Sequence, residues 1–355
     1  VLLKAHPGHP RTSAATADVV TTALTTAGAP DGVFALITGQ DAGARALQDP
    51  RITAAAFTRS VAGGRALFDL AAARPTPIPF FGELGSVNPA VVTAGALDER
   101  AEAIAAGFVG SFTLGAGQFC TKPGILLVPA GSPVVERITA LAQQVPAARM
   151  LTARIAEGYR TRIEQTAAVD GVEVLVKGIE TQGDGEVPAV SPTLLRTTAR
   201  QLTAHKDTLL EESFGPAAII AEYGSDEEIH QVLTGVDGTL TVTVHTRTTP
   251  TPDEQHQLRT LTRIAATRAG RLVFNGWPTG VAVTPAQHHG GPYPATTAVA
   301  HTSVGTTAIR RFLRPVTYQD APHTLLPTPI QDTNPLHIPR TINDAGESAT
   351  WGVES

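Results

Sequence analysis

Apolar runs alternate with Ala-rich segments through the first 84 residues, and this alternation limits the possible fold more than any other feature. Strand-like runs occupy residues 1–5, 32–39 and 52–60, and helix-like segments occupy 12–30, 41–50 and 61–75. The run at 1–4 is typical of a buried parallel strand. Strands separated by helices of this length pair in parallel through right-handed crossovers. We therefore expect an α/β fold with a parallel sheet over residues 1–84.

The pattern stays mixed α/β from about residue 85 to 290. Ser225 has a glutamate three residues later, which predicts a helix N-cap with a capping box. A second α/β unit of this kind would face the first across a cleft, where ligands usually bind. Strands are expected at 124–131, 171–178, 217–224, 239–246 and near 271–276; helices are expected at 96–117, 133–145, 225–236 and 251–268, with a helical pair at 147–168.

Residues 291–355 are rich in proline, which disfavours a packed helical domain. One helical turn is expected at 306–313, followed by an extended stretch at 313–318. The segment after Leu326 is expected to be an extended arm or a disordered tail.

Composition and charge exclude several classes of protein. The 355 residues are 42% hydrophobic and 17% charged, which is ordinary for a globular protein. The net charge of -5 and the lack of a Lys/Arg cluster argue against a nucleic-acid partner. No apolar run is long enough for a membrane span, and no signal peptide is apparent. A single cysteine without an export signal predicts a reducing, cytoplasmic location.

That cysteine, Cys120, lies in the glycine-rich stretch GFVGSFTLGAGQFCTKPG at 107–124. A lone cysteine forms no internal disulfide, and nearby glycines let the backbone approach a ligand closely. Two interpretations stay open on these residues alone, a buried hydrophobic thiol and a reactive nucleophile.

Two glutamates extend the pattern. Glu83 lies in FFGELGSVNP at 80–89, and Glu212 lies in EESFGP at 211–216. In this order and at these distances, the three motifs resemble the aldehyde dehydrogenase superfamily. KAHPGHPRTS at 4–13 and the stretch FNGWPTGVAVTPAQHHGGPYPATT at 274–297 are most similar to the α-ketoglutarate semialdehyde (2,5-dioxovalerate) dehydrogenases within it.

The resemblance implies three parts: a partial Rossmann-type cofactor domain at 1–84, a catalytic α/β domain at 85–290 and an extended oligomerisation segment at 291–355. A homo-oligomer, dimer or tetramer, follows from the resemblance. The start of the sequence, inside a strand and without Met, is expected to reflect truncation. The family portion that precedes this strand includes half of the cofactor sheet and an oxyanion-hole asparagine.

The resemblance also assigns cofactor contacts for NADP or NAD. Lys4 matches the lysine at the adenosine ribose, Ser60 the serine at the pyrophosphate, and Gly64 the glycine where the phosphate-facing helix begins. Glu212 matches the residue that holds the nicotinamide ribose, and Phe214 the residue that packs beside the nicotinamide.

Two positions depart from the family pattern. Pro7 replaces a glutamate that NAD-preferring members often use for the ribose 2′-hydroxyl, which makes NADP plausible. Arg59 replaces a small glycine beside Ser60, where it would either pair with phosphate or obstruct the nicotinamide side of the cleft.

The implied chemistry is oxidation of an aldehyde to a carboxylic acid through a thioester. Cys120 is the expected nucleophile, Glu83 the general base, and the Cys120 backbone N–H an oxyanion donor. The expected substrate is a small carboxylated aldehyde, α-ketoglutarate semialdehyde first. The alternatives are another aldehyde, a CoA-acylating reaction, or a catalytically silent binding or structural fragment.

Metal and hydrolase sites are not expected. His6 and His9 lie in a Pro-Gly turn, and His288 and His289 are adjacent, so neither pair has zinc-ligand spacing. No GxSxG pentapeptide is present for a serine hydrolase.

Overall fold

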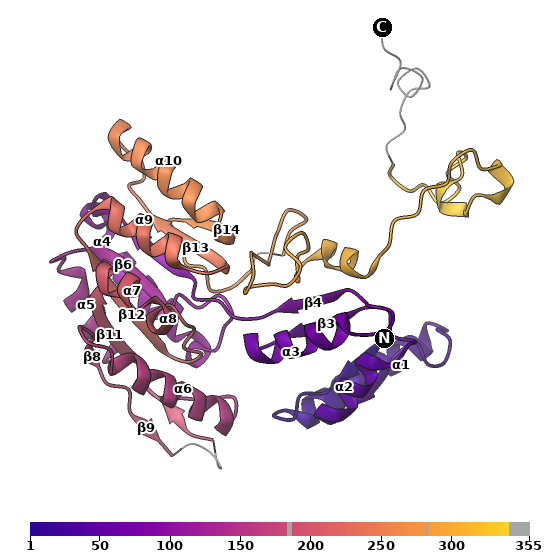
Figure 1. Ribbon diagram of the computed structural model, residues 1–355, viewed down its shortest axis with the longest axis horizontal. Helices are drawn as coiled ribbons and strands as arrows, with labels where there is room; N and C mark the ends of the chain where they lie inside the picture. The colour runs from indigo at the N-terminus through magenta and orange to yellow at the C-terminus, as the bar shows by residue number, and fades with distance from the viewer. Residues whose placement is uncertain (183–186, 282, 341–355) are drawn as a thin grey trace, which may run out of the picture. The chain divides into compact units, whose positions relative to one another are not determined.

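The computed structural model describes residues 1–182, 187–281 and 283–340 (Figure 1). The chain forms two compact units, Val1–Arg311 and a second that begins at Phe312. The three-part division at residues 84 and 290 stays a prediction.

The first 84 residues form parallel strand pairs linked by helices, as the alternation predicts. β1 (Leu2–Lys4) pairs with β2 (Ala35–Ile37), and β3 (Ala55–Thr58) pairs with β4 (Phe80–Glu83), both in parallel. The connecting helices are α1 (Pro10–Thr26), α2 (Gln40–Gln48) and α3 (Val61–Ala72).

The expectation that residues 1–4 form a buried strand is wrong. Leu2 and Leu3 are 40% and 43% exposed. β1 has a neighbour on only one side among the described residues, β2, and all three of its residues are exposed. A buried parallel strand needs covering layers and neighbours on both sides.

A seven-stranded sheet forms the centre of the larger unit. Its strand order is β14-β13-β5-β6-β12-β11-β8, and every adjacent pair is parallel except β11 with β8. The fold is therefore α/β with a mostly parallel sheet, as expected. The strands are β5 (Pro89–Val92), β6 (Ile125–Pro129), β8 (Glu173–Val176), β11 (Thr193–Thr198), β12 (Ala217–Tyr223), β13 (Thr239–His245) and β14 (Ala269–Phe274).

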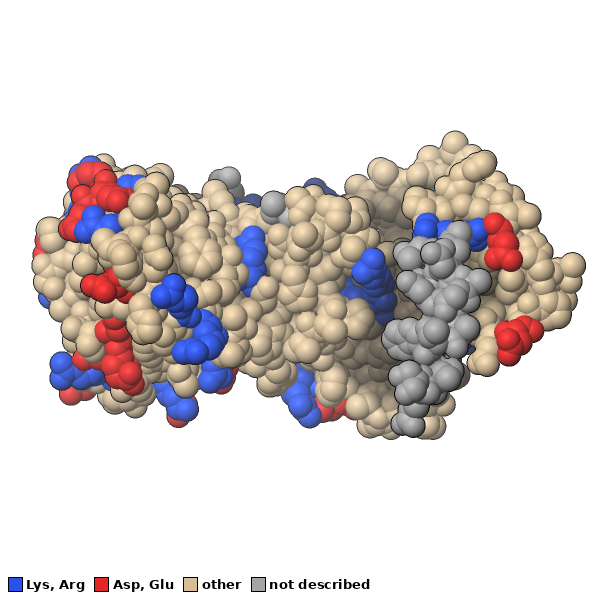
Figure 2. Space-filling model, turned by 90° about the horizontal axis from the view of Figure 1, so that it is seen from above, with Lys and Arg blue, Asp and Glu red and all other residues tan. Residues whose placement is uncertain are grey.

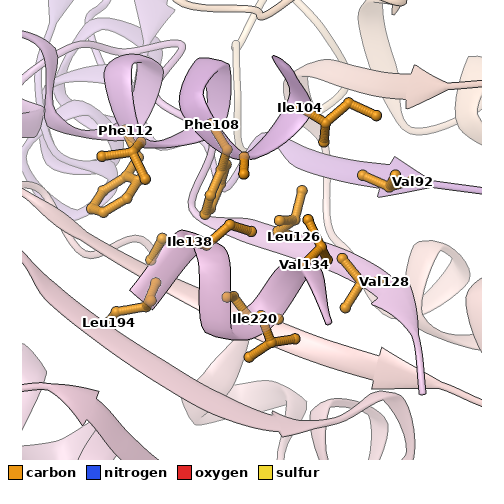
Figure 3. Close-up of a cluster of buried hydrophobic side chains, with 14 of the residues drawn as sticks. Val92, Ile104, Phe108, Phe112, Leu126, Val128, Val134, Ile138, Leu194 and Ile220 are labelled. Carbon is orange, nitrogen blue, oxygen red and sulfur yellow. The ribbon is translucent and has the colours of Figure 1, made fainter. Parts of the chain in front are cut away.

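Helices cover both faces of this sheet, because successive strand residues point to opposite sides. On β6, Leu126 and Val128 pack against α4 (Ala94–Thr113) and α5 (Val134–Ala142), together with Phe108 and Ile138 (Figure 3). Ile125 and Leu127 belong to the cluster on the other face. That face is covered by α7 (Ala199–Ala204), α8 (Lys206–Leu209), α9 (Asp226–Gly235) and α10 (Pro252–Ala266).

The expected helical pair at 147–168 is only partly right. A single helix, α6 (Ala153–Ala167), begins where the Thr152 side chain accepts a hydrogen bond from the Ile155 N–H. The preceding residues are extended as β7 (Ala148–Arg149), which pairs with β10 (Ala189–Val190); β9 (Glu180–Thr181) completes this small sheet. The cap fixes the helix start, and strand pairing satisfies the backbone before it.

The capping prediction at Ser225 is confirmed in its first half. The Ser225 hydroxyl accepts from the Glu228 N–H, while the Glu228 carboxylate accepts from the Gly224 N–H instead of closing the box. After β14 the described elements are short 3-10 turns: η2 (Thr306–Phe312), where one helical turn was expected, η3 (His323–Leu325) and η4 (Thr328–Ile330).

On the face shown in Figure 2, basic side chains lie in small separate groups, several of them beside acidic side chains, among uncharged residues. Among the described residues, no helix has the length and apolar character needed to cross a membrane.

Candidate active site

The loop that carries Cys120 follows α4 and is held by its own backbone geometry. It passes through a 3-10 turn, η1 (Leu114–Gly117), in which Gly115, Ala116 and Gly117 all have positive φ. A side chain at Gly117 would collide with the carbonyl group of Gly215. The glycine therefore permits close approach to another part of the chain, the EESFGP segment, rather than to a ligand alone.

Asn88 fixes the other side of this loop. Its side-chain amide donates to the carbonyl of Cys120 at 2.8 Å and to that of Lys122 at 3.0 Å. Its amide oxygen accepts from the backbone and hydroxyl of Thr241 on β13, at 3.2 and 3.0 Å. Asn88 is 1% exposed and has a φ of 52°, a conformation that asparagine tolerates better than most residues. The GSVNP motif thus positions the cysteine loop on the central sheet.

Cys120, Glu83 and His289 come together at one point. The Cys120 Sγ lies 3.6 Å from the His289 Nε2, and that nitrogen lies 3.1 Å from the Glu83 Oε1. Glu83 ends β4, and His289 lies in the loop after β14, so residues 206 positions apart meet here. Glu83 and His289 are 7% and 4% exposed, whereas Cys120 is partly exposed. The structure therefore brings the predicted nucleophile and base together and adds a histidine.

Hydrogen bonds from the surrounding loop orient the glutamate and the histidine. The Ser303 hydroxyl donates to the second carboxylate oxygen of Glu83. The His289 backbone donates to Thr302 and accepts from the Ser303 N–H. Both side chains are therefore held in a defined geometry before any ligand arrives.

The charges of this cluster support one another. Burial alone would lower the pKa of His289, but hydrogen bonds to Cys120 and Glu83 outweigh it and raise the pKa to about 9. Burial alone would raise the pKa of Glu83, but the His289 and Ser303 hydrogen bonds outweigh it and lower the pKa. The ionised forms, an imidazolium and a carboxylate, are both favoured at neutral pH. A cationic imidazole beside sulfur stabilises the negative charge that a nucleophilic cysteine carries.

The residues predicted to contact the cofactor pyrophosphate, Ser60 and Gly64, lie at the N-terminal end of α3. Ser60 is the N-cap of α3, its hydroxyl accepting from the Gly63 N–H. Gly64 is buried in the first turns of α3, where an added side chain would collide with Leu84. A strand, a turn and an exposed helix N-terminus form the arrangement that receives phosphate groups. Gly64 permits close packing of helix on strand, rather than approach to the phosphate itself.

Lys4, Pro7 and Arg59 lie near one another at the carboxyl ends of β1 and β3. Lys4 ends β1, and Pro7 and Arg59 are exposed. Burial and the nearby charges of Arg59, His9 and Lys4 together lower the pKa of His6, so basic side chains lie close to this edge. Such an edge suits an anionic group.

Glu212 is connected to the cysteine loop through Lys122. Both line one small cavity with Ser86, whose backbone donates to the Glu212 carboxylate. Burial raises the pKa of Glu212 and lowers that of Lys122, and the charge of each opposes the shift of the other. Phe214 follows two residues later and is partly buried.

Sequence reasoning missed several residues of this site. Asn88 and Lys122 lie inside the quoted motifs but received no role, while His289 was considered only as a metal ligand. The one sequence signal for His289 was its position before the GGPYPATT segment. Ser303 donates to Glu83, and the charge of Arg311 helps to lower the pKa of Glu83. Neither residue gave a local sequence signal, because these interactions form only in the folded chain.

Comparisons with known proteins identify the family of this chain. A family model described as "Aldehyde dehydrogenase family" matches residues 1–297. The chain is 41% identical over 353 residues to alpha-ketoglutaric semialdehyde dehydrogenase 2 of Azospirillum brasilense. This alignment covers 98% of this chain and 66% of the relative. It is 40% identical over 347 residues to the alpha-ketoglutaric semialdehyde dehydrogenase of Acinetobacter baylyi, in an alignment that covers 97% of this chain and 64% of that relative. The chain thus spans less than two thirds of the length of these relatives.

Solved structures show the same fold. The crystal structure of an NAD-dependent aldehyde dehydrogenase from Sinorhizobium meliloti superposes with a TM-score of 0.69 and 25% identity, covering 88% of this chain and 59% of that one. A 1-pyrroline-5-carboxylate dehydrogenase from Thermus with bound NAD gives a TM-score of 0.72 at 22% identity, with the same coverage. Motifs, fold and family model coincide over most of the sequence, and the chain belongs to the aldehyde dehydrogenase family.

Proposed function

We propose that this chain oxidises an aldehyde to a carboxylic acid through a thioester on Cys120, with NADP or NAD as cofactor. The observation that carries the proposal is the convergence of the Cys120 sulfur, the His289 imidazole and the Glu83 carboxylate, at 3.6 and 3.1 Å. A cysteine sulfur beside a cationic imidazole, with an ionised carboxylate close by to accept a proton, is an arrangement suited to covalent catalysis.

The first step is attack of the Cys120 sulfur on the aldehyde carbonyl. His289 stabilises the anionic sulfur, and the Cys120 backbone N–H donates to the oxygen that becomes negative. The Asn88 hydrogen bonds hold the cysteine loop in place during this step.

Loss of a hydride from the adduct carbon would give the thioester, and the next step is hydrolysis of that thioester. Glu83 accepts a proton from water, which then attacks the acyl carbon and releases the acid from Cys120. Ser303 holds the Glu83 carboxylate, and the lowered pKa of Glu83 keeps it in the form that accepts a proton.

The residues present fit a nicotinamide cofactor. The capped N-terminus of α3 and the cationic edge at Lys4 suit phosphate groups, and Glu212 and Phe214 belong to the loop packed on Gly117. When bound, the cofactor supplies a hydride acceptor. Ser60 and Gly64 would hold its pyrophosphate side, and Glu212 its nicotinamide ribose.

The substrate we propose first is α-ketoglutarate semialdehyde, which both curated relatives named above act on by name. Two cations lie close to the cluster and would pair with a substrate carboxylate. The charge of Arg271 acts on Cys120, and that of Arg311 acts on Glu83. Burial lowers the pKa of both guanidinium groups, so an added carboxylate would be favourable beside them.

The test is formation of reduced cofactor with this aldehyde and either NAD or NADP. Cys120→Ala should abolish turnover, and Glu83→Gln should lower kcat by about 10²–10⁴. Intact mass of Glu83→Gln should show the acyl group held on Cys120. Glu227→Gln, an exposed glutamate of α9 remote from the cluster, is the matched control and should behave as the wild type. Full activity of Cys120→Ala would refute the proposal.

The same experiment separates the alternatives. A CoA-acylating enzyme would retain turnover in Glu83→Gln when CoA is supplied, and a different aldehyde would give the higher specificity constant. For a silent binding fragment, iodoacetamide would react with Cys120 no faster than with free cysteine, and NADP would give no protection.

We further propose a homo-oligomer, a dimer or tetramer, since Val299, Leu313 and Val316 are exposed by 60%, 62% and 56%. Light scattering would measure its mass.

A further inference from the structure

Three ligand atoms of different chemistry converge at the cluster of Cys120, His289 and Glu83. The sulfur, the imidazole nitrogen and one carboxylate oxygen all lie within 4.8 Å of one another. We infer that these three side chains form a zinc-binding site that, when occupied, blocks Cys120 reversibly.

The distances match a tetrahedral zinc ion. Zinc bonds of about 2.3 Å to sulfur and about 2.0–2.1 Å to nitrogen and oxygen place tetrahedral ligand atoms about 3.6 Å (S to N) and about 3.4 Å (N to O) apart. The corresponding separations here are 3.6 and 3.1 Å. These two separations are within a few tenths of an ångström of the zinc values, and the third, from the sulfur to the carboxylate oxygen, is within 4.8 Å.

The donor set is one that zinc prefers. Zinc takes thiolate, imidazole and carboxylate ligands, whereas Mg²⁺ and Ca²⁺ prefer oxygen alone. Three protein ligands leave a fourth position for water, as in open zinc sites. The Ser303 hydroxyl on Glu83 and the two backbone hydrogen bonds of His289 hold these ligands from outside, which strengthens metal sites.

Charge around the cluster permits a divalent ion. The thiolate of Cys120 and the carboxylate of Glu83 balance the two positive charges of the zinc ion. The occupied site therefore has no net charge that would repel Arg271 and Arg311. Arg271 donates to the backbone carbonyls of Pro278 and Gly280, and Arg311 donates to that of Ala308. These bonds hold the Arg271 guanidinium on the loop that follows β14 and the Arg311 guanidinium on its own turn, η2.

Binding is a substitution without a redox change. The Nε2–H bond of the His289 imidazolium and the S–H bond of Cys120 break, and both protons pass to water. Zinc exchanges three of its waters for Nε2, a Glu83 carboxylate oxygen and the sulfur, and the sulfur–zinc bond forms with the sulfur lone pair. That lone pair is then no longer free to attack a carbonyl or an alkylating reagent. Only the inhibitory consequence rests on the proposed function, because metal binding itself requires no turnover.

The experiment uses Co²⁺ as a spectroscopic substitute for zinc on the full chain. We expect one Co²⁺ per chain, with a thiolate-to-cobalt charge-transfer band and the intense visible absorption of four-coordinate cobalt, displaced by Zn²⁺. Cys120→Ser should lose the charge-transfer band. His289→Asn and Glu83→Gln should each weaken binding by at least about tenfold.

His288→Asn is the matched control, since it removes the neighbouring histidine and leaves the three ligands in place. It should bind Co²⁺ as the wild type does. Far-ultraviolet circular dichroism of every variant verifies the fold, and Glu83→Gln replaces His289→Asn if the latter does not fold. Absence of the charge-transfer band in the wild type, or equal binding by His289→Asn and His288→Asn, would overturn the inference.

Discussion

Replacing Asn88 with alanine tests whether the GSVNP motif builds the site. The change removes the donors to the carbonyls of Cys120 and Lys122 and the acceptor for the Thr241 backbone. An unsatisfied buried polar group costs about 1–3 kcal/mol, and left-handed backbone costs alanine about 1 kcal/mol more. With partial relaxation we expect a loss of about 3–6 kcal/mol, a large part of the stability of an ordinary domain.

Urea unfolding measures this loss, and the rate of iodoacetamide alkylation reports the position of Cys120. Asn88→Asp keeps the acceptor for Thr241 but directs a carboxylate oxygen at two carbonyls, so it should lose at least about 2 kcal/mol. Asn275 is a suitable control because it also has positive φ and accepts from the Thr246 backbone at 2.8 Å. Asn275→Ala should destabilise the chain without changing alkylation. A loss below about 1 kcal/mol in Asn88→Ala, with normal alkylation, would refute the reasoning.

Three further outcomes are expected. Gly117→Ala should lower the free energy of unfolding by more than about 3 kcal/mol and slow turnover, because the new side chain would meet the Gly215 backbone. Gly131 also has positive φ but has open space around it, so Gly131→Ala should cost only about 1 kcal/mol. Urea unfolding compares the two variants. His245 is 3% exposed, and burial lowers its pKa from 6.5 to about 4. Between these pH values the unfolded chain binds a proton that the folded chain does not, so up to about 3 kcal/mol of stability is lost as pH falls from 6.5 to 4. Thermal unfolding followed across pH measures this dependence, and His245→Asn should remove it. Phe108→Ala, on the buried side of α4, should cost about 3–5 kcal/mol in urea unfolding, and a loss below about 1 kcal/mol would mean that the core refills the cavity.

Local pattern predicted the elements whose hydrophobic period is unambiguous. α3 begins at Val61 directly after its Ser60 cap, and β13 covers the alternating stretch TLTVTVH. The pattern failed at residues 147–152, where pairing of β7 with β10 outweighs helix propensity. It also failed at residues 1–4, because an apolar run records a preference for burial and not the neighbours that would provide it.

The sequence by itself determined the family and led to the proposals of Cys120 as nucleophile and Glu83 as general base, since their motifs are contiguous and carry their chemistry in a few residues. Only the tertiary structure decided which groups act on them. His289 lies 169 positions from Cys120, and Ser303 lies 220 positions from Glu83, so no local spacing links either pair. Hydrogen bonds between such distant residues depend on how the strands β4 and β14 are placed, which no local pattern encodes. The same convergence creates the proposed zinc site, whose ligands have no metal-binding spacing along the chain.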